Sequence, residues 1–86
     1  MSGELIVFGA EWCGPCRSSR PHLERYVENG GRATYVDVDS VRGMELAADF
    51  KVMSLPTVVR VGVDGDPRQI RVGPYGYDTL IGMLPV

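Results

Sequence analysis

The chain has 86 residues, of which 44% are hydrophobic, and its nine Lys and Arg and eleven Asp and Glu give a net charge of -2 at pH 7. This length suits a single small domain over residues 1–86 and excludes a second one. The arginines are scattered rather than gathered in a basic strip, which argues against nucleic acid as a partner, and no apolar run approaches the roughly 18 residues that a membrane span needs.

Two strands and two helices are predicted in the first half of the chain. A continuous apolar run over residues 5–8 predicts a central strand covered on both faces. Residues 13–28 have a helical pattern that Asn29-Gly30-Gly31 ends, and Pro21 is expected to kink this helix. Residues 33–38 form a second predicted strand, and Asp39-Ser40 predicts the start of a short helix over 41–50. The apolar stripe predicted for this short helix consists of Met44, Ala47 and Ala48.

The second half of the chain predicts a hairpin and a last helix. Strand-forming residues at 57–61 and 69–72 are joined through the turn signal Asp64-Gly65. Asp78 is expected to cap a helix that contains Leu80, Ile81 and Leu84. The whole order predicts an α/β fold, with a four-stranded mixed sheet and helices on both faces. Two strands would be parallel through a right-handed crossover, and two would be added as the antiparallel hairpin.

Cys13 and Cys16, the only cysteines, lie at the predicted turn from the first strand into the first helix. Such a pair can pass between dithiol and disulfide with little backbone movement, because the ring that it closes is small. The start of the chain lacks the basic and apolar segments of a secretory signal, so we expect a cytoplasmic protein. In a reducing compartment this spacing indicates catalysis or metal binding rather than a structural disulfide, and a single pair excludes a self-contained four-cysteine zinc site.

The segments around this pair resemble the thioredoxin family. Residues 10–16, Ala-Glu-Trp-Cys-Gly-Pro-Cys, resemble its active-site sequence, and Pro21 matches its helix proline. Residues 45–57 resemble the family's next helix and its loop proline, here Pro56, and Gly73 fits the glycine that follows the last strand. Because the matches run in order from Leu5 to Gly73, the resemblance implies a thioredoxin fold in the minimal form that glutaredoxins also use.

The chain also departs from the family pattern. In the family, a buried aspartate beneath the second cysteine assists proton transfer, but the matching residue here is Val7, and the aspartate's usual lysine partner falls at Tyr35. Gly9 replaces a family tryptophan, and Lys51 stands where a helix-ending glycine is usual. We therefore expect proton removal from Cys16 to be slower, or to be handled by water.

Cys13 is the predicted nucleophile. Its position at the start of a helix favours the thiolate, so its pKa is expected below the free value of about 8.5. Cys16, one turn further and more buried, is predicted to attack Cys13 in the mixed disulfide and release the reduced substrate. The alternatives are a pair of buried cysteines and half of an intermolecular metal site. Arg17 and Arg20 nearby are interpreted as solvated side chains rather than as groups that stabilise the thiolate.

Six further residues are predicted to contact the substrate: Trp12, Gly14, Pro15, Leu55, Pro56 and Gly73. Trp12 is expected to cover the motif as an apolar plate, with a core tryptophan as the alternative. The resemblance implies that the bond before Pro56 is cis and faces the cysteines. It also implies that the Leu55 backbone pairs with an extended segment of the substrate, and that Gly73 leaves room for that segment.

The resemblance implies a protein-disulfide reductase that acts as a monomer and has no bound cofactor. Electrons would come from NADPH through a flavoprotein similar to thioredoxin reductase. The acceptors would be proteins that form a disulfide in turnover, such as ribonucleotide reductase.

Three other functions compete with this prediction. A glutathione-dependent glutaredoxin is suggested by Gly76-Tyr77-Asp78, although Asp78 is more simply explained as a helix cap. A binding subunit with incidental thiols would explain the departures at Val7, Gly9 and Tyr35. The third is a dimer bridged by an iron–sulfur cluster through Cys13, against which the proline in the motif argues.

Overall fold

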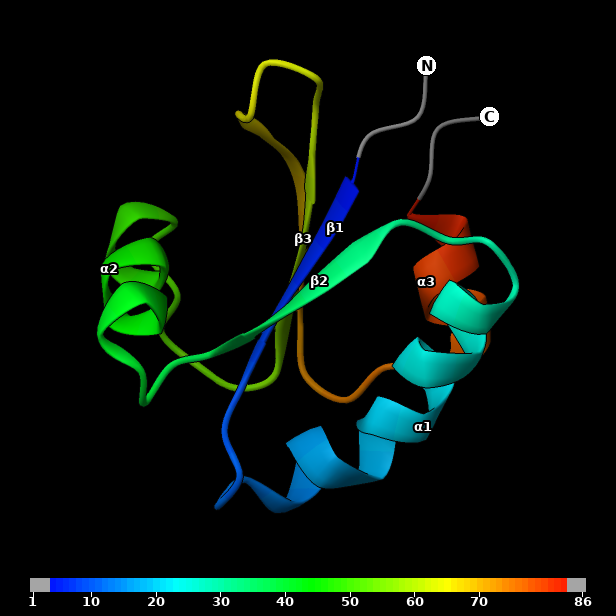
Figure 1. The fold of residues 1–86 in the computed structure, drawn as a ribbon, viewed down its shortest axis with the longest axis horizontal. Helices are drawn as coiled ribbons and strands as arrows, with labels where there is room; N and C mark the ends of the chain where they lie inside the picture. The colour runs from blue at the N-terminus through cyan, green and yellow to red at the C-terminus, as the bar shows by residue number, and fades with distance from the viewer. Residues whose placement is uncertain (1–3, 84–86) are drawn as a thin grey trace.

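The computed structural model describes residues 4–83, which form four strands and three helices (Figure 1). In chain order these are β1 (Glu4–Gly9), α1 (Gly14–Glu28), β2 (Ala33–Asp37), α2 (Val41–Asp49), β3 (Thr57–Val61), β4 (Pro67–Val72) and α3 (Tyr77–Gly82). Each strand begins and ends within two residues of the predicted bounds. Within residues 4–83, none of the helices has the length and apolar character needed to cross a bilayer.

The strands form one mixed sheet in the order β2-β1-β3-β4. β1 pairs in parallel with β2 and antiparallel with β3, and β3 pairs antiparallel with β4. Figure 1 shows α1 and α3 on one side of the sheet and α2 on the other. The predicted α/β fold, with β1 inside a four-stranded sheet and helices on both faces, is therefore confirmed.

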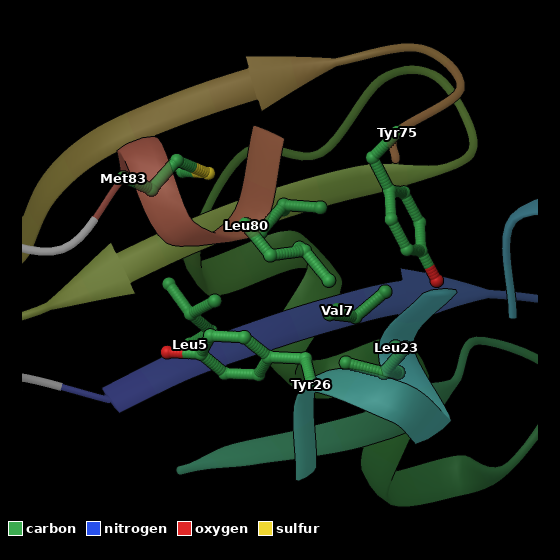
Figure 2. Close-up of a cluster of buried hydrophobic side chains, with 8 residues drawn as sticks. Leu5, Val7, Leu23, Tyr26, Tyr75, Leu80 and Met83 are labelled. Carbon is green, nitrogen blue, oxygen red and sulfur yellow. The ribbon is translucent and has the colours of Figure 1, made fainter. Parts of the chain in front are cut away.

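One core lies between the sheet and the layer formed by α1 and α3 (Figure 2). β1 supplies Leu5 and Val7, which are fully buried, and α1 supplies Leu23 and Tyr26. The cluster is completed by Val58, Tyr75, Leu80 and Met83. The buried positions of α1 are 16, 19, 23 and 26, so a single face of the helix packs over β1 from the cysteine end onward.

A second core lies between the sheet and α2. Phe8 packs there with Val36, Val59 and Val61, and its ring meets that of Phe50 edge-on at 5.9 Å. The predicted stripe of α2 is wrong in phase, because Met44 and Ala48 are exposed. The face that turns inward consists of Gly43, Leu46, Ala47 and Phe50.

Gly43 explains this phase. It is buried in the first turn of α2, and a Cβ at this position would overlap the carbonyl of Asp37. The absence of a side chain lets the helix start sit directly on the end of β2. Gly43 thus determines which face of α2 turns toward the sheet. A glycine does not contribute to an apolar pattern, so the spacing of apolar residues does not reveal its role.

The start of α3 also differs from the prediction. Its N-cap is Gly76, and Asp78 lies within the first turn, where a carboxylate favours the helix dipole without capping a backbone group. The Gly76 N–H donates instead to Thr79 Oγ1 at 3.1 Å. Leu80 of this helix is buried and Ile81 is half exposed, whereas Leu84 lies outside the described residues.

Candidate active site

Cys13 is the N-cap of α1, with φ -88° and ψ 109°, and Cys16 lies in the first turn of the helix. A disulfide joins them, with their Cα atoms 5.2 Å apart. The Cys13 sulfur also accepts a hydrogen bond from the Cys16 N–H at 3.2 Å. Unpaired N–H groups and the helix dipole favour negative charge at this position, and the first turn of α1 contains no acidic residue that would oppose it. The local structure therefore favours a thiolate on Cys13 once the disulfide is reduced.

The two cysteines differ in their access to solvent. Cys13 is 6% exposed and Cys16 is 1% exposed. Both pack with Ala10, whose carbonyl accepts the Cys13 N–H at 3.2 Å. The chain leaving β1 is thus tied to the helix start, and it holds Cys13 on the outer side of the pair.

An open groove of about 390 Å³ borders Cys13. None of the residues that line it, all from the described part of the chain, is charged. They are Trp12, Cys13, Val38, Ala47, Val52, Met53, Ser54 and Leu55. Cys16 is not among them, so a molecule in this groove meets one sulfur of the pair and not the other.

Trp12 forms one wall of the groove and is 67% exposed, which excludes the alternative of a core tryptophan. Its indole N–H donates to Asp39 Oδ2 at 2.8 Å. This bond ties the ring to the loop after β2. An apolar ring fixed in place at the surface loses little conformational freedom when another molecule covers it.

The bond between Leu55 and Pro56 is cis, as predicted. Leu55 lines the groove, whereas Pro56 is buried and accepts the Gly73 N–H at its carbonyl at 2.8 Å. Gly73 has φ 107°, a conformation that favours glycine. Of the predicted contact residues, the structure therefore places Trp12 and Leu55 in the groove. Pro56 and Gly73 are not among its lining residues, and their hydrogen bond joins the segments next to β3 and β4.

The remaining two predicted contact residues, Gly14 and Pro15, are exposed at the start of α1. A Cβ at Gly14 would meet nothing within 4 Å. The surface beside the disulfide is therefore open at this point, and another chain can approach the helix start.

The charged groups near the motif bond to one another. Arg20 pairs with Glu11 at 2.9 Å, and Arg17 donates to the backbone carbonyl of Glu11 at 3.4 Å. The Arg20 guanidinium also lies over the Tyr35 ring, 4.4 Å from its centre. Within residues 4–83, no three His, Cys, Asp or Glu side chains gather where they could hold a metal ion.

Sequence reasoning missed a group of polar side chains next to the cysteine face of α1. The Tyr35 hydroxyl lies against Gly9, where a Cβ would come within 2.5 Å of it. Ser19, which is 3% exposed, accepts the Tyr75 N–H at its hydroxyl at 3.1 Å. Burial, and secondarily the neighbouring Tyr35, raises the pKa of Tyr75 to about 12. Two departures from the family pattern, Gly9 and Tyr35, could have indicated this group, because the small residue makes room for the large one. A comparison that considers one position at a time does not connect them.

Comparisons with known proteins agree with this geometry. The family model named Thioredoxin matches residues 2–84. The thioredoxin of Streptomyces clavuligerus is 39% identical over 80 residues, which cover 81% of this chain and 75% of the relative. The thioredoxin of Staphylococcus haemolyticus is 39% identical over 82 residues, which cover 94% of this chain and 78% of the relative. A solved structure of the thioredoxin of Fasciola hepatica superposes with a TM-score of 0.76 at 34% identity, covering 93% of this chain and 77% of the other. The predicted thioredoxin fold is thus confirmed.

Proposed function

The chain belongs to the thioredoxin family of thiol–disulfide oxidoreductases, and from this premise we propose that it is a protein-disulfide reductase in which Cys13 attacks the substrate and Cys16 resolves. One observation carries the proposal. The apolar groove borders Cys13 and not Cys16, so a substrate disulfide in the groove meets the sulfur at the start of α1. This difference in access supports Cys13 as the nucleophile and Cys16 as the resolving thiol.

The reaction takes place in two exchanges. The Cys13 thiolate attacks one sulfur of the substrate disulfide, so that the substrate S–S bond breaks, a mixed disulfide forms and the other substrate sulfur leaves as a thiolate. Cys16 then loses its proton to water and attacks the Cys13 sulfur. The mixed disulfide breaks, and the second substrate sulfur leaves as a thiolate. Two electrons pass from the dithiol to the substrate, and Cys13 and Cys16 end as the disulfide present in the structure.

The groove favours an extended, apolar substrate segment next to the disulfide. Trp12 and Met53, which are 67% and 92% exposed, are large apolar surfaces that such a segment would cover. Leu55 lines the same groove as these two residues and Cys13, and it precedes the cis bond, where its backbone can pair with an added strand. Gly14 and Pro15 would lie under the edge of the substrate, and Pro56 and Gly73 would hold the Leu55 segment in place.

The reductant in this proposal is NADPH, acting through a flavoprotein similar to thioredoxin reductase, and the chain itself holds no cofactor. In this scheme the two sulfurs carry the electrons. Proteins that form a disulfide in each turnover, ribonucleotide reductase among them, are the proposed acceptors. We propose a monomer, because one chain supplies both sulfurs and the groove beside Cys13. The cytoplasm is the proposed compartment, because a dithiol reductant needs surroundings that keep thiols reduced.

Reduction of insulin disulfides tests the proposal. The wild-type protein should reduce insulin with NADPH and thioredoxin reductase, or with dithiothreitol as the only reductant. Cys13→Ser should abolish the activity, whereas Cys16→Ser should stall as a mixed disulfide that mass spectrometry detects on Cys13. Cys13→Ser combined with Cys16→Ser is the matched control without thiols.

Two results would contradict the proposal. Efficient turnover by Cys16→Ser with glutathione and its reductase would indicate a glutaredoxin. A mixed disulfide formed on Cys16 in the Cys13→Ser variant, at the wild-type rate, would reverse the two roles.

A further inference from the structure

Tyr26, Tyr35 and Tyr75 each have a hydroxyl that is shielded from solvent and has no hydrogen-bond partner among the residues that the structure describes. A buried polar group without a partner is costly, and most folded proteins contain few of them. Three in one small core, all of the same chemical type, therefore need an explanation. Packing alone would be served as well by phenylalanine.

Two of these hydroxyls lie at the end of β1 that leads to the cysteines. The Tyr35 hydroxyl covers Gly9, the last residue of β1. Figure 2 shows the Tyr75 ring reaching from its own segment toward β1, with the hydroxyl beside the strand near Val7. The Tyr75 backbone is bonded to Ser19, one turn beyond Cys16 on the buried face of α1. The hydroxyls of Tyr35 and Tyr75 thus lie in the layer between the end of β1 and the first turns of α1.

The resolving step needs hydrogen-bond donors in this layer. Val7 and Gly9 offer no polar side chain to the face of α1 that carries Cys16, and burial disfavours a thiolate. A disulfide sulfur is a weak hydrogen-bond acceptor, whereas a thiolate is charged and accepts strongly. Donors that find no partner in the disulfide state would find one when Cys16 loses its proton.

We propose that the hydroxyls of Tyr35 and Tyr75 are hydrogen-bond donors to the Cys16 thiolate during the resolving step. This inference rests on the proposed division of roles between Cys13 and Cys16. The hydroxyls keep their protons: the Cys16 proton passes to water, the S–S bond between Cys13 and the substrate breaks, and the bond between Cys13 and Cys16 forms. The donors stabilise the charge on Cys16 before it attacks.

The charged neighbours of the pair fit this role. The Arg20 guanidinium lies over the Tyr35 ring and is itself held by Glu11. Burial raises the pKa of Tyr35, and Arg20 only partly opposes this effect, so the hydroxyl keeps the proton that it would donate at neutral pH. Glu11 and Asp37 are the acidic groups that act on Tyr35. Tyr75 faces Tyr35, Arg20 and Glu24, and its own burial keeps it protonated at neutral pH.

Exchange with Ellman's reagent separates the two steps in one experiment. Attack by Cys13 releases the first nitrothiobenzoate, and attack by Cys16 on the resulting mixed disulfide releases the second. Stopped-flow measurements between pH 5 and 9 therefore give a pH profile for each step. In Tyr35→Phe or Tyr75→Phe the second release should slow by about tenfold at pH 7, and the midpoint of its profile should rise by about one pH unit. The first release should match the wild type.

Tyr26→Phe is the matched control. It removes the third hydroxyl of the same kind, which lies in the same core further along α1, near Gly31. Both releases should match the wild type in this variant, because Tyr26 is about three turns away from the cysteine pair on the helix. All three variants keep the aromatic ring and lose only the hydroxyl. If either Tyr35→Phe or Tyr75→Phe fails to fold, the other variant provides the same test.

The outcomes are distinct. A second release that is unchanged in the double variant of Tyr35 and Tyr75 overturns the inference and leaves the proposed function intact. Equal slowing of both releases, or the same slowing in Tyr26→Phe, also overturns it, since that result would reflect core packing. A release at the wild-type rate of the first step in Cys13→Ser, which retains only Cys16, would instead contradict the proposed function.

Discussion

Lys51 ends α2 in a conformation that suits glycine, and replacing it tests how the structure terminates this helix. Its φ of 57° lies in the left-handed region. The N–H of Lys51 donates to the Ala48 carbonyl at 3.1 Å, and that of Val52 donates to the Ala47 carbonyl at 2.8 Å. These two bonds form the Schellman motif, in which this residue is usually glycine. The side chain is exposed, so little packing is lost when it is removed.

The expected gain from Lys51→Gly follows from two opposing terms. A side chain in the left-handed region costs about 1–2 kcal/mol. Glycine loses more backbone freedom on folding than lysine does, and this entropy loss destabilises the Lys51→Gly variant by about 0.5–1 kcal/mol. The net stabilisation should be about 0.5–1 kcal/mol, which raises the midpoint of thermal unfolding of a domain of this size by about 2–8 °C.

Thermal unfolding of the oxidised protein, followed by circular dichroism, measures this gain. Lys51→Ala is the matched control, because it removes the charge near the end of α2 and keeps the Cβ. Lys51→Gly should unfold at a higher temperature than Lys51→Ala and than the wild type. If glycine and alanine give the same midpoint, the backbone at residue 51 does not carry the cost that its φ angle implies.

Two further predictions concern stability. Gly43→Ala should destabilise the protein by about 1–3 kcal/mol in urea unfolding, although alanine favours a helix, because the new Cβ would overlap the Asp37 carbonyl. Gly82→Ala, at a helical position with open space around it, should be neutral or stabilising, and an equal loss in both variants would contradict this reasoning. The raised pKa of Tyr75, about 12 against 10.0 when unfolded, means that only the unfolded state gains stability from ionisation above pH 10. The free energy of unfolding should therefore hold below pH 10 and fall between pH 10 and 12, and Tyr75→Phe should make that fall shallower.

Local signals predict most of the elements. Three of these signals are the apolar run of β1, the glycines after Asn29 and the turn at Asp64-Gly65. Each depends only on neighbouring residues, so the structure has the predicted strand, helix end and turn at these places. The cis bond at Pro56 has no local signal and is predicted only through the family resemblance. The division between an outer Cys13 and an inner Cys16 follows from their spacing on one helix turn, and the burial of the two residues agrees with it.

The errors occur at the starts of two helices, where a glycine backbone sets the position of the helix. The phase of α2 depends on Gly43 resting on the end of β2, and a glycine adds nothing to an apolar pattern. The sequence places the start of α3 at Asp78 because its carboxylate can cap a helix, but the backbone begins the helix at Gly76 and Thr79 supplies the side-chain oxygen. The contact that sets the phase of α2 joins distant segments, whereas the bond at the start of α3 is local and has the backbone N–H of a residue without a side chain as its donor.

Gly9 and Tyr35 show why separate departures from a family pattern can form one structural feature. In the parallel register, Tyr35 lies opposite Val7, and its hydroxyl extends along β1 to the space above Gly9. That space exists only because residue 9 has no side chain. The Tyr35 side chain therefore takes the space that a side chain at position 9 would need, and the Arg20 guanidinium lies over its ring. The departures at these two positions are therefore one coordinated change, which places a tyrosine hydroxyl at the last residue of β1, where the chain turns toward the cysteine pair.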